Sequence, residues 1–300
     1  MAAGLPDDLR ARGFAGPVLA EEPLAPHTTW RIGGPAEILA MPRGVEDLAL
    51  ALSWARDRGV PWRVLGNGSN LLVRDAGVRG LVLHVRKVLD DVRVDGATVA
   101  AGAGASFPAL ARLAASHGLT GLEFAAGIPG TAGGAVVMNA GWHAFETGAL
   151  VRSVDALDEE GIVTTHGPEA CRFVYRASAF KGRPAVVLSA ELALTPADSR
   201  TIQARMDEFA ASRKANQPTD LPSCGSVYLK PEGDYAGRLI EAAGLKGRRV
   251  GDVQVSPKHA NFFVNLGHAT AQEVLVLADL VEVEVLRRFG VRLTREFEVW

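Results

Sequence analysis

Cysteine is scarce in this sequence, with Cys171 and Cys224 the only two, and they form no Cys-x-x-Cys pair. A cysteine zinc site and a dithiol redox centre are therefore excluded, and a chain of 300 residues is too long for a small disulfide scaffold. The seven histidines form no His-Glu-x-x-His motif. We predict no metal site.

Long apolar runs and an excess of charge are also missing. No stretch reaches the roughly 18 apolar residues of a membrane-spanning helix, and Met1–Asp8 lacks the basic and apolar regions of a secretion signal. Lys and Arg total 32 against 34 Asp and Glu, which gives a net charge of −2. The sequence has no block of basic residues, which binding to nucleic acid would require. We expect a cytoplasmic protein with no nucleic-acid and no membrane partner.

What is present is the composition of a globular chain, 48% apolar and 22% charged. The length suits about two domains of ~150 residues. We place the boundary at Pro196, after a long apolar strand. Helices are expected at 45–58, 106–117, 197–214 and 235–243, and from the capping box of Thr270 and Glu273 to Phe289. Predicted strands are 62–65, 71–73, 81–85, 92–94, 98–100, 151–157, 161–165, 185–194, 253–255, 261–265 and 291–300.

Two glycine-rich segments can present backbone N–H groups to an anion, because no Cβ stands in the way. The first follows a strand but is no Rossmann fingerprint, because Leu71 replaces the third glycine and the chain continues extended. The second has four glycines in eight residues, so no regular element is expected there. The two could hold the two phosphates of one dinucleotide; the alternative is that the glycines only serve tight turns. The candidate cofactor-binding residues are Gly66, Asn67, Gly68, Ser69 and Asn70, and Gly127, Ile128, Pro129, Gly130, Thr131, Gly133 and Gly134.

Several motifs occur in a fixed order along most of the chain. They are His27-Thr-Thr-Trp-Arg-Ile-Gly-Gly-Pro-Ala36, Leu65-Gly-Asn-Gly-Ser-Asn-Leu-Leu72, Glu123-Phe-Ala-Ala-Gly-Ile-Pro-Gly-Thr-Ala-Gly-Gly-Ala135 with Met138-Asn-Ala-Gly141, Phe173-Val-Tyr-Arg-Ala-Ser178, Gln217-Pro, Ser223-Cys-Gly-Ser226 and Ser256-Pro-Lys-His-Ala-Asn261. In these motifs, from about residue 24 to the end, the sequence resembles the UDP-N-acetylenolpyruvoylglucosamine reductase family. It lacks the insertion that carries a substrate-capping tyrosine, so it resembles the shorter type.

The resemblance implies an α+β fold. Residues 1–195 would form a two-lobed FAD-binding domain of the vanillyl-alcohol-oxidase (PCMH) type, with lobes of about 1–75 and 76–195. Residues 196–300 would form an α+β substrate domain whose last strand, 291–300, returns toward the flavin.

The resemblance also implies an FAD-containing, NADPH-dependent oxidoreductase that reduces the enolpyruvyl ether of UDP-N-acetylglucosamine to UDP-N-acetylmuramate. This is a cytoplasmic step of peptidoglycan precursor synthesis, and so of cell-wall biogenesis, cell shape and cell division. A monomer is expected.

Three residues match catalytic positions of that family. Arg176 would grip the substrate carboxylate, which a guanidinium can do bidentately. Ser226 would protonate the substrate carbanion, and Glu296 would act near the reacting double bond as an electrostatic partner or second acid. Alternation in the last strand groups Val291, Leu293, Phe297 and Val299 on one face and Thr294, Glu296 and Glu298 on the other. Arg295 falls on the apolar face without an explanation.

Tyr175, Arg213, Lys230 and Lys258 are candidate substrate-binding residues, since a UDP-sugar diphosphate needs basic partners. For the three basic residues, ordinary solvated side chains are the alternative. Lys230 departs from one branch of the family, which has Asn at this position. Two other functions stay open: another FAD-dependent oxidase of the same fold, some of which tether the flavin covalently, and a nucleotide-binding module without catalysis.

Overall fold

Two units make up the chain, and each is assembled from several separate segments. Unit 1 comprises residues 1–21, 37–67 and 79–211, and unit 2 comprises 22–36, 68–78 and 212–300. The computed structural model describes residues 4–86 and 88–300. These units are defined by packing, so the functional boundary expected at Pro196 stays a prediction.

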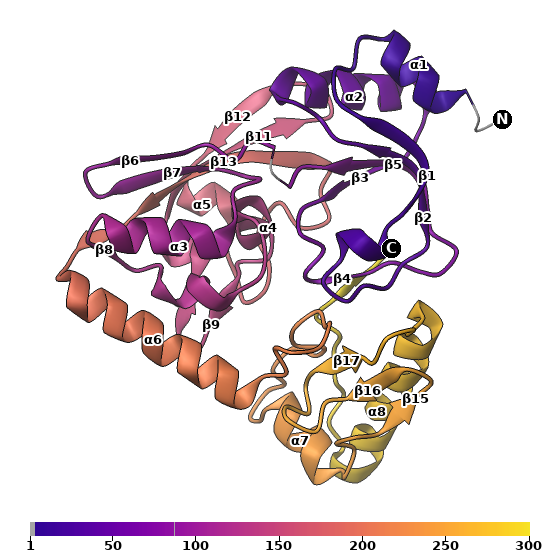
Figure 1. Cartoon of the computed structure of the whole chain (residues 1–300), viewed down its shortest axis with the longest axis vertical. Helices are drawn as coiled ribbons and strands as arrows, with labels where there is room; N and C mark the ends of the chain where they lie inside the picture. The colour runs from indigo at the N-terminus through magenta and orange to yellow at the C-terminus, as the bar shows by residue number, and fades with distance from the viewer. Residues whose placement is uncertain (1–3, 87) are drawn as a thin grey trace. The chain divides into compact units, whose positions relative to one another are not determined.

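Unit 1 contains two sheets. The first has the strand order β1-β2-β5-β3, with β3 and β5 parallel, and the second is antiparallel with the order β12-β11-β13-β7-β6. The first sheet packs against α1 and α2 through a core that includes Leu9, Trp54 and Leu83. The second packs against α3 and α4 through a core that includes Val99, Phe107 and Val136 (Figure 1).

The elements that lie wholly or mainly in unit 1 have the following bounds. They are α1 (Leu5–Ala11), β1 (Val18–Pro23), β2 (Pro35–Ala40), α2 (Val45–Arg58), β3 (Trp62–Leu65), β5 (Val78–His84), β6 (Val92–Asp95), β7 (Thr98–Gly102), α3 (Phe107–Ser116), β8 (Leu119–Thr120), the 3-10 helix Glu123–Gly127, α4 (Ala132–Val137), β9 (Gly141–Trp142), β10 (Phe145–Glu146), the 3-10 helix Thr147–Ala149, β11 (Val151–Asp158), β12 (Val163–His166), α5 (Pro168–Cys171), β13 (Ala185–Ala193), β14 (Thr195–Pro196) and α6 (Ser199–Asn216).

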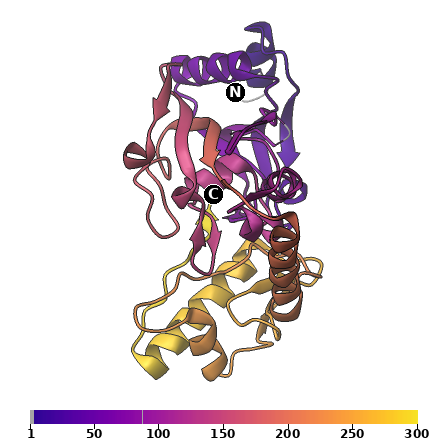
Figure 2. The same ribbon diagram turned by 90° about the vertical axis from the view of Figure 1, so that its left-hand side faces the viewer.

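Unit 2 is built around α8, the long yellow helix of Figure 2. Its apolar face packs against a small antiparallel sheet of order β15-β16-β17 and against α7. Trp30, from a distant early segment, is fully buried in this core and donates its indole N–H to the carbonyl oxygen of Phe263 at 3.1 Å. The elements of unit 2 are the 3-10 helix Ala25–His27, β4 (Leu71–Leu72), α7 (Ala236–Ala242), β15 (Arg249–Val250), β16 (Val253–Val255), β17 (Phe263–Asn265), α8 (Ala271–Phe289) and β18 (Glu298–Val299).

Elements with strong local signals match their predictions. α2 has the predicted bounds and ends at Gly59, which adopts the left-handed conformation at φ 62°. The capping box of Thr270 and Glu273 opens α8, and Gly290 ends it. The helix predicted at 197–214 is displaced by two residues, since α6 spans Ser199–Asn216.

Two predictions of local structure were wrong. The glycine-rich segment was expected to hold no regular element, yet α4 begins at Ala132, because the Thr131 hydroxyl caps it by accepting from the N–H of Gly134 at 3.2 Å. The last strand covers only Glu298–Val299 instead of 291–300, because the segment before it pairs, in the described part of the chain, only through one isolated antiparallel bridge, between Arg295 and Tyr228. Leu293 and Phe297 are nevertheless both buried, as the alternation predicts.

Within the described residues, no helix is both long enough and apolar enough to cross a membrane.

Candidate functional site

The first glycine-rich loop connects β3 to β4. Among the described residues, none accepts a hydrogen bond from the backbone N–H of Gly66, Asn67, Gly68 or Ser69. Gly68 is buried at φ 58°, and a Cβ there would lie 2.6 Å from the carbonyl oxygen of His27. Buried N–H groups normally have an acceptor, so this run of donors suits an anion.

The second glycine-rich segment uses its glycines in part for internal packing. The N–H of Gly133 donates to the carbonyl oxygen of Ala103 at 2.9 Å, and a Cβ on Gly133 would lie 2.7 Å from the Cβ of Ala103. The N–H of Gly134 is engaged by Thr131. The N–H groups of Gly130 and Thr131 meet no acceptor in the part of the chain that the structure describes. The donors of this segment therefore lie before α4.

The two segments meet inside unit 1, although they are far apart in the sequence. A Cβ added to Gly66 would lie 2.9 Å from the hydroxyl oxygen of Thr131. Only glycine allows this approach, which brings the start of the first loop, at Gly66, beside Thr131 of the second segment. Within unit 1, the unused N–H groups of Gly66 and Asn67 and those of Gly130 and Thr131 fit the diphosphate of a dinucleotide such as FAD.

Arg176 and Tyr175 lie at the tip of a tight turn in unit 1. Val174 and Ala177 close this turn by exchanging two backbone hydrogen bonds of 3.0 and 3.1 Å. Arg176 adopts φ 58°, its guanidinium donates to the carbonyl oxygen of Gly141 at 3.0 Å, and it lies 5.3 Å from the ring centroid of the half-exposed Tyr175. The turn thus holds a cation in an unusual backbone conformation.

Ser226 belongs to unit 2 and follows Gly225, whose φ of 84° makes the bend before it. The two residues after Ser226 are fixed by Asn261, which accepts from the N–H of Val227 through its carbonyl oxygen at 2.8 Å. Its side-chain amide accepts from the N–H of Tyr228 and donates to that residue's carbonyl oxygen, at 3.0 and 2.8 Å. The backbone that follows Ser226 is therefore held by Asn261.

Glu296 lies on the segment next to Ser226 in unit 2, because its N–H donates to the carbonyl oxygen of Val227 at 2.8 Å. The Asn70 amide, at the end of the first loop, donates to the carbonyl oxygen of Glu296 at 3.1 Å. Burial raises the pKa of the Cys224 thiol well above its usual value, and the nearby negative charge of Glu296 raises it further. The predicted pair Ser226 and Glu296 is thus brought together.

Thr29 connects the first glycine-rich loop to the Ser226 loop within unit 2. Its N–H donates to the carbonyl oxygen of Gly68 at 3.2 Å, and its hydroxyl donates to the carbonyl oxygen of Ser223 at 2.8 Å. Sequence reasoning assigned no role to Thr29, Asn139 or Asn261, although all three stand in quoted motifs. Their places inside those motifs were the only feature of the sequence that could have marked them as site residues.

The predicted basic residues of unit 2 are spread over several elements. Lys230 is exposed and lies 4.5 Å from the ring centroid of Tyr235, while the exposed Lys258 donates to the carbonyl oxygen of Lys214 at the end of α6. Arg213 is half-buried, and burial lowers the pKa of its guanidinium. Lys230 and Lys258 keep charged groups at the surface, where an anion could replace their present contacts.

Arg295 now has an explanation. Its guanidinium pairs with Glu282 and Asp279, both on α8, so the arginine ties the C-terminal segment to that helix. These acidic partners lie 13 and 16 residues before Arg295, on another element, so the alternation within the last strand could not reveal them.

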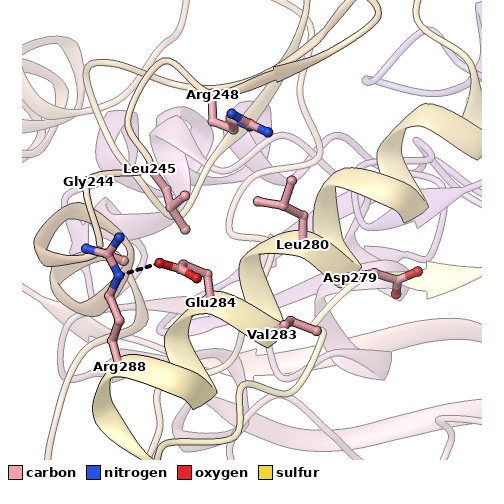
Figure 3. A pocket seen from close by; sticks show the side chains of 9 residues that line it. Gly244, Leu245, Arg248, Asp279, Leu280, Val283, Glu284 and Arg288 are labelled. Carbon is pink, nitrogen blue, oxygen red and sulfur yellow. Dashed lines mark hydrogen bonds and ion pairs between the residues drawn. The ribbon is translucent and has the colours of Figure 1, made fainter.

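One pocket of unit 2, of about 540 Å³, lies between the end of α7 and α8 (Figure 3). Arg288 pairs with Glu284 one turn earlier on α8, and hydrogen bonds from Arg287 and Arg288 lower the pKa of Glu284 to about 2. None of the predicted site residues is among those that line it.

Close relatives decide the family. A UDP-N-acetylenolpyruvoylglucosamine reductase of Moorella thermoacetica is 48% identical over 94% of this chain and 93% of its own length, and one of Symbiobacterium thermophilum is 47% identical over 95% of this chain and 92% of its own length. This chain belongs to the UDP-N-acetylenolpyruvoylglucosamine reductase family.

Two family models and one solved structure agree with that membership. Residues 217–300 match the C-terminal domain of UDP-N-acetylenolpyruvoylglucosamine reductase, and residues 36–167 match an FAD binding domain. The crystal structure of the reductase from Thermus caldophilus superposes with a TM-score of 0.81 at 37% identity, covering 95% of this chain and 98% of that one. The predicted resemblance and the α+β fold with an FAD-binding domain are confirmed.

Proposed function

We propose that this chain is the enzyme that reduces the enolpyruvyl ether of UDP-N-acetylglucosamine to UDP-N-acetylmuramate in peptidoglycan precursor synthesis. Its cofactor is FAD and its reductant is NADPH. Membership of the reductase family supports the reaction. The observation that carries the proposal is the Gly66–Asn70 loop. The N–H groups of Gly66 to Ser69 are unused, while the Gly68 carbonyl oxygen and the Asn70 amide connect the loop, through Thr29 and directly, to the segments of Ser226 and Glu296.

FAD supplies the hydride chemistry, taking reducing equivalents from NADPH and delivering them to the substrate. The N–H groups of Gly66 to Ser69 in the first loop, and of Gly130 and Thr131 in the second, would hold its diphosphate. Gly133 and Gly134 would support this site by packing and by capping instead of by direct donation. Asn70, Gly127, Ile128 and Pro129 are the other residues that we assign to the FAD site.

Arg176 would bind the carboxylate of the enolpyruvyl group, with Tyr175 beside it. Addition of hydride to the terminal carbon places negative charge on the adjacent carbon and the carboxylate. A fixed guanidinium that stays charged stabilises that charge as it develops.

Ser226 would donate a proton to the carbon adjacent to the carboxylate. A serine hydroxyl is a weak acid, so it needs a strongly basic acceptor and a fixed position, which Gly225 and Asn261 provide. Glu296 would act from the neighbouring segment as an electrostatic partner or second acid.

Arg213, Lys230 and Lys258 would contact the diphosphate of the UDP group. We place the enzyme in the cytoplasm as a monomer, with no nucleic-acid and no membrane partner. The functional division into a 1–195 FAD-binding domain and a 196–300 substrate domain belongs to the same proposal.

The absorption spectrum of the purified protein tests the proposal. We expect a flavin spectrum that NADPH bleaches and that the enolpyruvyl substrate restores under anaerobic conditions. Acid precipitation should leave the flavin in the supernatant. Bleaching without recovery on adding substrate, or colour that stays with the precipitate, would favour another FAD-dependent oxidase of this fold.

A further inference from the structure

Asn139 lies one residue beyond the C-terminal cap of α4 and is 1% exposed. Both the nitrogen and the oxygen of its side-chain amide form hydrogen bonds within unit 1. The nitrogen donates to Glu146 Oε2 at 2.9 Å and to the carbonyl oxygen of Val174 at 3.0 Å, and the oxygen accepts from the N–H of Gly148 at 2.8 Å. One side chain thus connects three separate segments.

The contact with Val174 fixes the turn that presents Arg176. The same carbonyl oxygen accepts the N–H of Ala177, which closes the turn. On the other side of the turn, the Ser178 hydroxyl donates to the carbonyl oxygen of Val137, the last residue of α4, at 2.9 Å. Both sides of the Arg176 turn are therefore attached to the C-terminal end of α4.

Backbone conformation shows that this arrangement is imposed by its surroundings. Asn139 adopts φ 43° and Arg176 adopts φ 58°, values that are unfavourable for residues with a Cβ, although asparagine tolerates them best. Such conformations persist where the surrounding contacts determine them, and they are concentrated at functional sites. Asn139 supplies the contacts that hold the turn in this state.

We infer that Asn139 is a positioning residue for substrate binding, acting through Arg176. α4 begins directly after the Gly127–Thr131 segment and ends beside Asn139. The helix therefore sets the distance between the proposed flavin loop and the proposed carboxylate-binding arginine, and Asn139 attaches the arginine turn to it. This inference rests on the proposed function, because it concerns how the enolpyruvyl carboxylate is held.

A double-mutant cycle tests the inference. Asn139→Asp keeps the shape and the acceptor for Gly148 but removes both donated hydrogen bonds. Asn139→Gly removes these bonds and the acceptor for Gly148, adds no charge beside Glu146, and accepts φ 43° without steric cost. Each is combined with Arg176→Met. The readout is the Kd of the enolpyruvyl substrate, followed through the flavin absorbance of the oxidised enzyme.

We expect either Asn139 variant to weaken substrate binding about 10- to 100-fold when Arg176 is present, and less than about twofold in the Arg176→Met background. Flavin reduction by NADPH should stay within about twofold of the unmodified enzyme, because that step does not use the substrate carboxylate. An equal loss of affinity in both backgrounds, or no loss in either, would overturn the inference. An unmodified enzyme that fails to bind the substrate would instead overturn the proposed function.

A second readout needs no cofactor. Loss of the Val174 contact should loosen the turn, so trypsin should cleave the flavin-free chain after Arg176 faster in Asn139→Asp than in the unmodified chain. The matched control is Thr147→Val, which removes the buried hydrogen bond from the Thr147 hydroxyl to the carbonyl oxygen of Ala140 without touching the turn. It should change neither the Kd nor the cleavage rate. Equal cleavage of Asn139→Asp and the unmodified chain would contradict the positioning role.

Discussion

At the scale of single residues, the candidate proton donor depends on its neighbours for its place. Gly225 provides the bend, and Asn261 fixes the next two residues through backbone and side-chain hydrogen bonds. The serine itself contributes only a hydroxyl. Its removal should therefore change chemistry without disturbing the fold.

Ser226→Ala should separate the two half-reactions. Flavin bleaching by NADPH needs no proton from the serine, so its rate should be nearly unchanged. Reoxidation by the enolpyruvyl substrate should fall by roughly 10²- to 10⁴-fold, the usual contribution of general acid catalysis. Stopped-flow absorbance of each step measures both rates. Equal slowing of the two steps would mean that the serine positions ligands instead of donating a proton.

His259 makes the stability of unit 2 depend on pH. Burial lowers the pKa of its imidazole, and the charge of Lys246 lowers it further. The unfolded chain therefore takes up a proton on His259 near the ordinary value of about 6.5, while the folded chain takes it up only at lower pH. This contribution to stability is present above pH 6.5 and is lost as the pH falls from there toward the folded-state pKa.

We expect His259→Gln to lose less stability than the unmodified protein between pH 7.5 and pH 5.5. Urea unfolding of both proteins at these two pH values gives the comparison. Gln can accept a hydrogen bond from the N–H of Asn261, as His259 Nδ1 does at 3.2 Å. The same pH dependence in both proteins would show that other groups dominate.

At the scale of elements, the N-terminus of α8 is capped from two places. The capping box of Thr270 and Glu273 is local, whereas Asp75 belongs to a distant segment of unit 2. Its carboxylate accepts from the N–H groups of Ala271 and Gln272 at 2.8 and 3.0 Å. The first turn of the main helix of unit 2 therefore depends on a loop that follows β4.

Asp75→Ala should destabilise the protein by about 1 to 2 kcal/mol, because two N–H groups at a helix N-terminus lose a charged acceptor. Asp75→Asn keeps an acceptor of the same shape, so it should cost less. Urea unfolding measured for both variants tests the order. A smaller loss for Ala than for Asn would mean that the carboxylate does not stabilise the helix.

Elements differ in how far the sequence predicts them, for a physical reason. α2 and the start of α8 depend on residues within a few positions, so periodicity, caps and glycines were sufficient. α4 forms because Gly133 fits against Ala103 in another segment, and propensity alone disfavours a helix there. In the site, the motifs identified Arg176, Ser226 and Glu296 as candidates. The residues that hold their segments in place act through contacts between distant parts of the chain, which motifs do not show. These are Asn139, Thr29 and the partners of Arg295 on α8.

At the scale of the whole molecule, neither unit is a continuous stretch of chain. Unit 2 takes Trp30, Ile32 and Leu72 into the same core as α7 and α8. β18 pairs with β4 in parallel, and the Asn265 amide donates to the carbonyl oxygen of Trp30 at 3.0 Å. The C-terminal residues alone therefore lack part of their own core.

A fragment of residues 196–300 should not fold by itself, although it corresponds to the proposed substrate domain. It lacks Trp30, Leu72 and the Asp75 cap, so the packing around α8 would be incomplete. Near-ultraviolet circular dichroism and urea titration of the purified fragment test this. A sigmoidal unfolding transition would contradict it and would show that the early segments are dispensable.

The interleaving of segments also affects synthesis on the ribosome. Trp30 and Ile32 emerge early, but Val227 and the core residues that follow it are made about 200 residues later, a delay on the order of 10 to 40 s at the usual translation rates. During that interval two large apolar side chains have no native partners. Nascent chains should therefore present a chaperone-binding segment around residues 22–36 until translation nears its end.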